Sequence, residues 1–334
     1  MCAIAIGDLS RHLVLRHEMT RAKMDLRNLL GEAASERKSD VAKSFRGDVS
    51  ELTSLETTIA NLTSWSRSAS LQLTRLAGQQ QALSVMNQMA DDLWSKLTLS
   101  EPETPLPQRK IIAEEAATVL EKMLAGLNTT VGGEALFSGM RSDSPSVSDG
   151  QTVLTHLRGL IAGMSSASDI RDAISSWFSQ PGGYESNAYQ GSTSRPELRI
   201  GSSETSSLSI TALAPEIREI LSGVALAAIA VDYLTPQDYE IGAQLINMSA
   251  DRILSGSSDR ISLMARVGVE EHYAAQALSR NNAELAATTL RRGDLLGVDP
   301  YETASALQGA QNRLELIYAV TARLSDLSLV RVLR

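Results

Sequence analysis

The chain has 334 residues, enough for two or three ordinary domains, and its hydrophobic content of 43% is near the globular average. A net charge of −8, without any cluster of lysine and arginine that could neutralise a phosphate backbone, argues against a nucleic-acid partner. Aromatic residues make up only 4%, so the core must be built mainly from aliphatic side chains and alanine, which favours helices packed on helices.

The sequence shows no pattern typical of a membrane span, a cleaved signal peptide or a disulfide. The longest strictly apolar run, Val224 to Val231, is far below the roughly 20 residues that a membrane-spanning helix needs, so no membrane span is expected. The opening MCAIAIG has no basic region and a very short apolar run, and no cleaved signal peptide is expected. The single Cys2 excludes an internal disulfide and a cysteine metal site.

A first helix is predicted over residues 7–39, which contain no proline. Its apolar residues recur every three or four positions and form a heptad seam, the pattern of helices that pair side by side. The seam comprises Leu15, Met19, Ala22, Leu26, Leu29 and Ala33. A break is predicted near Arg46 to Asp48, with Asp48 or Ser50 as the N-cap of the next helix.

The next segment carries the strongest periodic signal in the sequence. From Leu52 to Leu97, fourteen positions alternate in steps of three and four, and eleven of them are apolar. The polar exceptions are Ser66, Gln80 and Asn87. A period of 3.5 residues sustained over this length predicts a long coiled-coil-like helix rather than an ordinary globular one.

After a proline-rich stretch, Arg109 to Asn128 resumes as a helix, and a short strand is expected over Glu134 to Ser138. The residues that follow, 144–214, are rich in serine, glycine and threonine, which indicates a small mixed α/β insertion. Two short helices are predicted there, Val153 to Met164 and Ile170 to Phe178. PELRIG and LSITAL flank the polar GSSETSS and predict a β-hairpin.

Helical patterning then returns. Helices are predicted from Pro215 to about Tyr233, from Pro236 to about Leu254, and from Arg260 towards Arg292. The seam of the third includes the polar residues Glu271 and Asn281. A final helix begins with Asp299 as N-cap and Pro300 at its first position.

The final helix has apolar residues on two faces. The first stripe follows heptad steps and comprises Leu307, Ala310, Leu314, Ile317 and Leu324, with Thr321 between them. The second comprises Leu316, Val320, Leu327 and Val330. One wide stripe facing the core of a monomer is an alternative interpretation, but two stripes fit a helix with more than one neighbour, and this favours assembly.

Two long helical regions therefore flank a central segment that is poor in helical pattern. Each apolar stripe of these regions needs another helix to pack against. The predicted fold is mainly α: an elongated helical bundle or coiled coil formed by the N- and C-terminal regions, with a small mixed insertion. We expect a terminal coiled-coil assembly domain from 1–45 and 294–334, a rod-like helical bundle from 46–143 and 215–293, and an inserted outer domain at 144–214.

Motifs for chemistry are weak. Ser35 to Lys38 matches the S-x-x-K spacing of serine β-lactam enzymes, but the other motifs of those enzymes are missing. The four histidines fit no metal-binding pattern, and no glycine-rich phosphate loop occurs. The sequence predicts no catalytic, cofactor-binding or metal-binding residues, and no enzyme.

Three stretches resemble a known family. LELIYAVTARLSDLSLVRVL, from Leu314 to Leu333, strongly resembles the C-terminal helix of the flagellin superfamily, and RISLMARVGVEEHYAAQALSRNNAEL, from Arg260 to Leu285, resembles the long helix before it. GGEALFSGMRSDSP, from Gly132 to Pro145, is similar to a stretch of the hook-associated branch of that family. SDVAKSFRGDVS departs from the pattern, because it lacks the paired aspartates and the alanine-glycine that many flagellins carry at the first break.

The resemblance implies a structural subunit of the bacterial flagellum that joins hook to filament as a ring of identical copies and is needed for filament assembly and swimming. It implies export through the flagellar type III apparatus with a dedicated chaperone, an extracellular location, and contacts with a hook-side junction protein and with filament flagellin. Both apolar seams, from Leu15 to Leu29 and from Leu307 to Val330, would be the assembly interface. A filament flagellin, and more remotely a cytoplasmic coiled-coil scaffold, are the alternatives.

Overall fold

The computed structural model describes residues 3–99, 105–194, 197–206 and 210–332, without the side chains of 3–9, 11, 12 and 325–332. The fold is mainly α, as predicted, and the described strands form two small two-stranded antiparallel sheets. The chain divides into two compact units, one of residues 62–282 and one of the residues up to 61 and from 283 onward. The predicted division into three domains stays a prediction.

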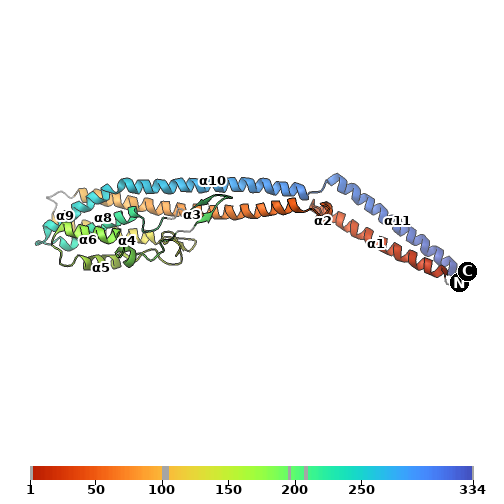
Figure 1. The fold of residues 1–334 in the computed structure, drawn as a ribbon, viewed down its shortest axis with the longest axis horizontal. Coiled ribbons are helices and arrows are strands. Elements are labelled where there is room, and N and C mark those ends of the chain that lie inside the picture. The colour runs from red at the N-terminus through yellow and green to blue at the C-terminus, as the bar shows by residue number, and fades with distance from the viewer. Residues whose placement is uncertain (1–2, 100–104, 195–196, 207–209, 333–334) are drawn as a thin grey trace. The chain divides into compact units, whose positions relative to one another are not determined.

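The helices and strands are numbered along the chain, and Figure 1 labels most of the helices. The helices are α1 (Ala3–Ser35), α2 (Val41–Ser44), α3 (Ser50–Thr98), α4 (Leu106–Leu127), α5 (Gly150–Leu160), α6 (Ala167–Ser179), α7 (Tyr184–Asn187), α8 (Pro215–Tyr233), α9 (Tyr239–Ser255), α10 (Ser257–Leu296) and α11 (Pro300–Val332). The strands are β1 (Thr130–Val131), β2 (Glu134–Ala135), β3 (Leu198–Arg199) and β4 (Thr205–Ser206).

The long heptad pattern of α3 is confirmed. All fourteen predicted seam positions from Leu52 to Leu97 are buried or half-buried. The polar members of the α10 seam within residues 62–282 are also removed from solvent: Glu271 is half-buried and Asn281 is buried. The 3.5-residue period therefore identifies the packed face of both helices, polar residues included.

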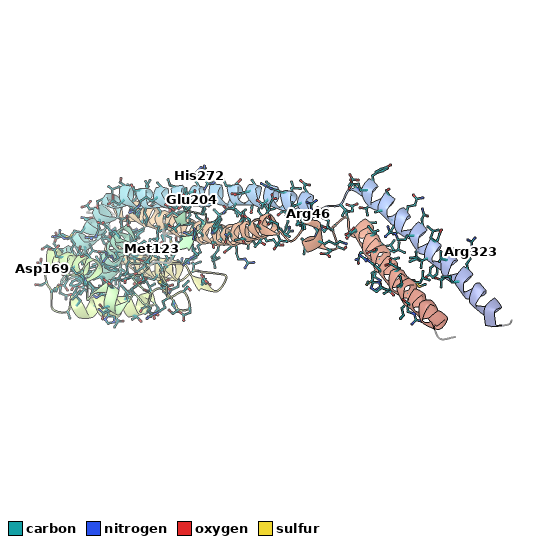
Figure 2. The ribbon with its side chains drawn as sticks, turned by 45° about the vertical axis from the view of Figure 1, so that its right-hand side comes forward. Arg46, Met123, Asp169, Glu204, His272 and Arg323 are labelled. Atoms are coloured by element: carbon teal, nitrogen blue, oxygen red, sulfur yellow. The ribbon has the colours of Figure 1, made fainter. Side chains whose placement is uncertain are left out.

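The core of the 62–282 unit is organised around α8. Its residues from Ile220 to Ala230 are buried, since α8 packs against α4, α6 and α9 (Figure 1). Alanine at several of these positions lets neighbouring backbones approach closely, so the apolar run noted in the sequence is a fully enclosed core helix. Met123 of α4, labelled in Figure 2, is completely buried in the same core.

The segment from Ala135 to Ser142 connects distant parts of this unit. Phe137 is fully buried, and its carbonyl accepts a hydrogen bond from the amide of Ala212 at 3.0 Å. Gly139 has a φ of +66°, and a Cβ there would lie 2.2 Å from the carbonyl oxygen of Ser192. Only glycine fits this close approach without strain. The predicted strand over Glu134 to Ser138 is therefore wrong beyond Ala135, since the chain turns to make these contacts.

The predicted hairpin forms, with a different register. Leu198 pairs with Ser206 and Arg199 with Thr205, so two residues assigned to the turn belong to β4. The turn closes early because the amide of Ile200 donates to the carbonyl of Glu204 at 3.0 Å. Ile200 is fully buried between Ala69 of α3 and Ala277 of α10, and this contact fixes the register. Leu208 and Ser209, predicted as strand, lie outside the described residues.

Buried arginine Arg260 joins three elements of this unit. It is only 6% exposed. Its guanidinium donates to Asn87 Oδ1 at 2.9 Å, to the Ile253 carbonyl at 2.7 Å and to Asp91 Oδ1 at 3.2 Å. Burial lowers the pKa of this guanidinium, and the Asp91 carboxylate counteracts the shift. The arginine therefore ties the start of α10 to α3 and to the last turn of α9.

We expect Arg260→Met to lower the free energy of unfolding by about 2–4 kcal/mol, because it leaves the buried Ile253 carbonyl and Asn87 without their donor. Urea unfolding followed by circular dichroism measures the change. The matched control is Arg266→Met, since Arg266 pairs with Glu216 but its side chain is 59% exposed; its expected cost is below about 1 kcal/mol. Equal costs for the two variants would contradict this role of Arg260.

Candidate assembly surface

The predicted seam of the first helix faces α11. In the unit that contains both, α1 and α11 run antiparallel, side by side (Figures 1 and 2). Ala22 is 4% exposed, and Leu15, Met19, Leu26 and Leu29 are half-buried. Ala33, which was also predicted for this seam, is exposed. The structure therefore brings these five residues together on one face of α1.

The first stripe of α11 lies on the matching face. Its described members are all half-buried, namely Leu307, Ala310, Leu314, Ile317, Thr321 and Leu324. Across the pair, Lys23 Nζ of α1 lies 5.7 Å from the ring centroid of Tyr318 on α11, a cation–π distance. Burial stops at about half because a pair of helices can cover only one side of each member.

The described side chains of the second stripe of α11 are exposed. Leu316 is 65% exposed and Val320 is 45% exposed. The side chains of Leu327 and Val330, predicted for the same stripe, lie outside the described residues. Large apolar side chains left exposed at helical spacing are typical of a surface that meets another partner.

The first helix also carries exposed apolar residues outside the predicted seam. Leu13, Val14 and Met24 of α1 are all more than half exposed. They do not lie at heptad positions, so the spacing did not predict them. A usable signal was present for two of them, because Leu13 and Val14 are adjacent apolar residues directly before the seam residue Leu15. The helix pair thus carries exposed apolar side chains on both of its members.

Two connecting segments, residues 36–49 and 297–299, link the pair to α3 and α10, and we call them the joint. The predicted helix over 7–39 ends earlier, at Ser35, because Glu36 takes a φ of +56° and the chain then runs antiparallel to Gly297. The predicted break at Arg46 to Asp48 is confirmed by positive φ at Arg46, labelled in Figure 2, and at Gly47.

The predicted cap of α11, Asp299, is confirmed. At α3 the carbonyl of Val49 accepts the first helical hydrogen bond, so Val49 is the N-cap, although the predicted Asp48 does pair an amide there. Asp48 Oδ1 accepts a hydrogen bond from the amide of Ser50 at 3.1 Å, and its hydrogen bonds with Ser50 lower the pKa of the Asp48 carboxyl. Asp299 Oδ1 accepts from the amide of Tyr301 at 2.8 Å at the start of α11. Each carboxylate satisfies amides that the helix itself cannot pair.

Neither a metal-binding cluster nor a membrane-spanning helix is found among the described residues. No group of three or more histidine, cysteine, aspartate and glutamate residues there could hold a metal ion. None of the helices, as far as the structure describes them, is long and apolar enough to cross a membrane. The expectations of no enzyme and no cofactor stay predictions.

No family model matches the sequence, and the search of curated proteins finds no match. Among solved structures, one of a protein from Vibrio parahaemolyticus, described as flagellar hook-associated, aligns with a TM-score of 0.52 over 73% of this chain and 95% of its own, at 13% identity. The fold of this chain is similar to the fold of that Vibrio protein. Bacillus cereus FlgL aligns over 71% of this chain and 99% of its own, with 12% identity and a TM-score of 0.43. The resemblance expected from the sequence is thus confirmed at the level of the fold.

Proposed function

We propose that this protein is a structural subunit of the bacterial flagellum, a hook-associated protein that joins hook to filament. The observation that carries the proposal is the α1–α11 pair. It has a shared seam that is mostly half-buried, and Leu316 and Val320 of the second apolar stripe on α11 are exposed. The similarity in fold to the hook-associated protein of Vibrio parahaemolyticus supports the same role.

In this role, identical copies pack side by side as a ring through the helix pair. One end of the ring contacts a hook-side junction protein and the other contacts filament flagellin. The exposed apolar residues of α1 and α11 supply the driving force, since burying each large aliphatic side chain contributes about 1.5–3 kcal/mol. Part of that gain offsets the entropy of ordering the pair on assembly.

Delivery follows from the same proposal. The subunit leaves the cell unfolded through the flagellar type III apparatus, escorted by a chaperone that covers its C-terminal region, and folds at the growing tip. The chain suits such a route, because its single cysteine forms no internal disulfide and its core is built mainly from aliphatic side chains. Its working location is then the extracellular flagellum.

Deleting the gene and imaging the cells by electron microscopy tests the proposal. We expect hooks without filaments, flagellin released into the medium, and loss of swimming. Expression of the wild-type chain from a plasmid is the control and should restore filaments. Complete filaments in the deletion strain would contradict the junction role. If the deletion strain released no flagellin into the medium, and the purified chain polymerised by itself into filaments, the chain would be a filament flagellin instead.

A further inference from the structure

Lys38 donates twice to the last turn of α10. Its backbone amide donates to the carbonyl of Leu296 at 2.9 Å, and its side-chain Nζ donates to the carbonyl of Leu295 at 3.0 Å. The last carbonyls of a helix have no partner inside it, and a cation near them also interacts favourably with the helix dipole. One residue of the first connecting segment therefore caps the helix that leads into the second.

The same lysine also contacts the segment that follows it. Its Nζ lies 4.9 Å from the ring centroid of Phe45, a half-buried residue just after α2. On the other side, Glu32 of α1 accepts hydrogen bonds from the amide and hydroxyl of Ser39, at 2.9 and 2.8 Å. Lys38 thus contacts both the last turn of α10 and the residue that ends α2.

The backbone of the joint needs such support. Glu36 and Arg46 both have positive φ, which is unfavourable for residues with a Cβ and persists only where surrounding contacts enforce it. Two backbone hydrogen bonds link residues 36–38 to residues 296–298: the amide of Lys38 donates to the carbonyl of Leu296, and the amide of Val298 donates to the carbonyl of Glu36 at 3.2 Å. The side chain of Lys38 adds a third link at this crossing, to the carbonyl of Leu295.

We propose that Lys38 is a clasp that keeps the joint folded in the free subunit and so fixes the direction in which α1 and α11 leave it. The folded joint is a property of the single chain. Its consequence for assembly rests on the function proposed above: with the joint held, both helices of the pair are presented together to the next copy, and a mechanical load passes through a stiff connection.

Hydrogen exchange of the purified subunit, followed by mass spectrometry, tests the clasp without any flagellum. In the wild-type chain we expect peptides over 36–48 and 293–299 to exchange more slowly than peptides from the middle of α1. Lys38→Met keeps the aliphatic stem and removes the ammonium donor, so we expect exchange in both peptides to become about tenfold faster. Lys38→Arg keeps a cationic donor and should restore most of the protection.

The matched control is Lys43→Met, which removes the same charge from an exposed position of α2. It should leave both peptides unchanged. The clasp is disproved if Lys38→Met exchanges like Lys43→Met, or if the wild-type joint already exchanges as fast as an unfolded peptide. Normal filaments in the gene-deletion strain would contradict the proposed flagellar role. They would not bear on the clasp, which the exchange rates of the purified subunit test independently.

Discussion

Leu314→Asp is expected to abolish incorporation of the subunit into the flagellum while leaving the 62–282 unit folded. Leu314 lies on the half-buried face between α11 and α1, and in the proposed assembly that face loses its remaining contact with water. A carboxylate placed there would cost several kcal/mol, since it would be desolvated without a partner. Leu324→Asp on the same stripe should behave alike.

The readout is rescue of the deletion strain, with filaments counted by electron microscopy and the released subunit measured in the medium. Gln311→Glu is the matched control, because it adds the same charge to α11 at an exposed position beside the seam. Thermal unfolding of the purified variant shows whether the 62–282 unit is intact. Normal filaments with Leu314→Asp would count heavily against the α1–α11 seam as part of the assembly.

Leu316→Asp separates the two stripes of α11. Because Leu316 is exposed in the single chain, its replacement should leave the helicity of the free subunit unchanged. If the second stripe meets another copy, the variant should still fail to restore filaments. Restoration equal to that by Gln311→Glu would assign Leu316 to solvent and limit the interface to the first stripe.

The long helices were predictable because their signal is local and repeated. Every heptad position of α3 obeys one rule, and a few polar exceptions such as Gln80 do not weaken it. The hairpin register was not predictable in the same way, since Ile200 is placed by Ala69 and Ala277, which are remote in sequence. The end of the first helix was missed for a related reason: Ser35 to Ser39 contains no helix breaker, and its pairing with Gly297 is a tertiary contact.

The candidate surface was predictable in part. The spacing of apolar residues alone predicted most of the side chains at the contact between α1 and α11, because a packed helix face repeats regularly in the sequence. Exposed residues such as Leu13 and Met24 leave none, and only the placement of the two helices shows that they lack cover. Lys38 carried no periodic signal either, since its role depends on where α10 ends in space.

The paired glycines at 182 and 183 show how two residues with the same sequence signature can have different roles. Gly182 has a φ of +93°, and a Cβ there would meet no atom within 4 Å. Gly183 has an ordinary φ of −91°, but a Cβ there would lie 2.0 Å from the carbonyl oxygen of Trp177 and 2.7 Å from the carbonyl carbon. Trp177 is the start of an aromatic cluster with Phe178 and Tyr184, whose rings lie 4.9 to 5.9 Å apart.

Gly183→Ala is therefore expected to destabilise the 62–282 unit by about 3 kcal/mol or more, since the clash is with backbone and cannot be relieved by rotating a side chain. Gly182→Ala is the matched control and should cost about 1–2 kcal/mol, the cost of a Cβ at positive φ. Urea unfolding monitored by the fluorescence of Trp177 and the chain's other tryptophans measures both. A smaller loss for Gly183→Ala than for Gly182→Ala would mean that α7 can move away from the end of α6. The aromatic cluster would then not require the close approach at Gly183.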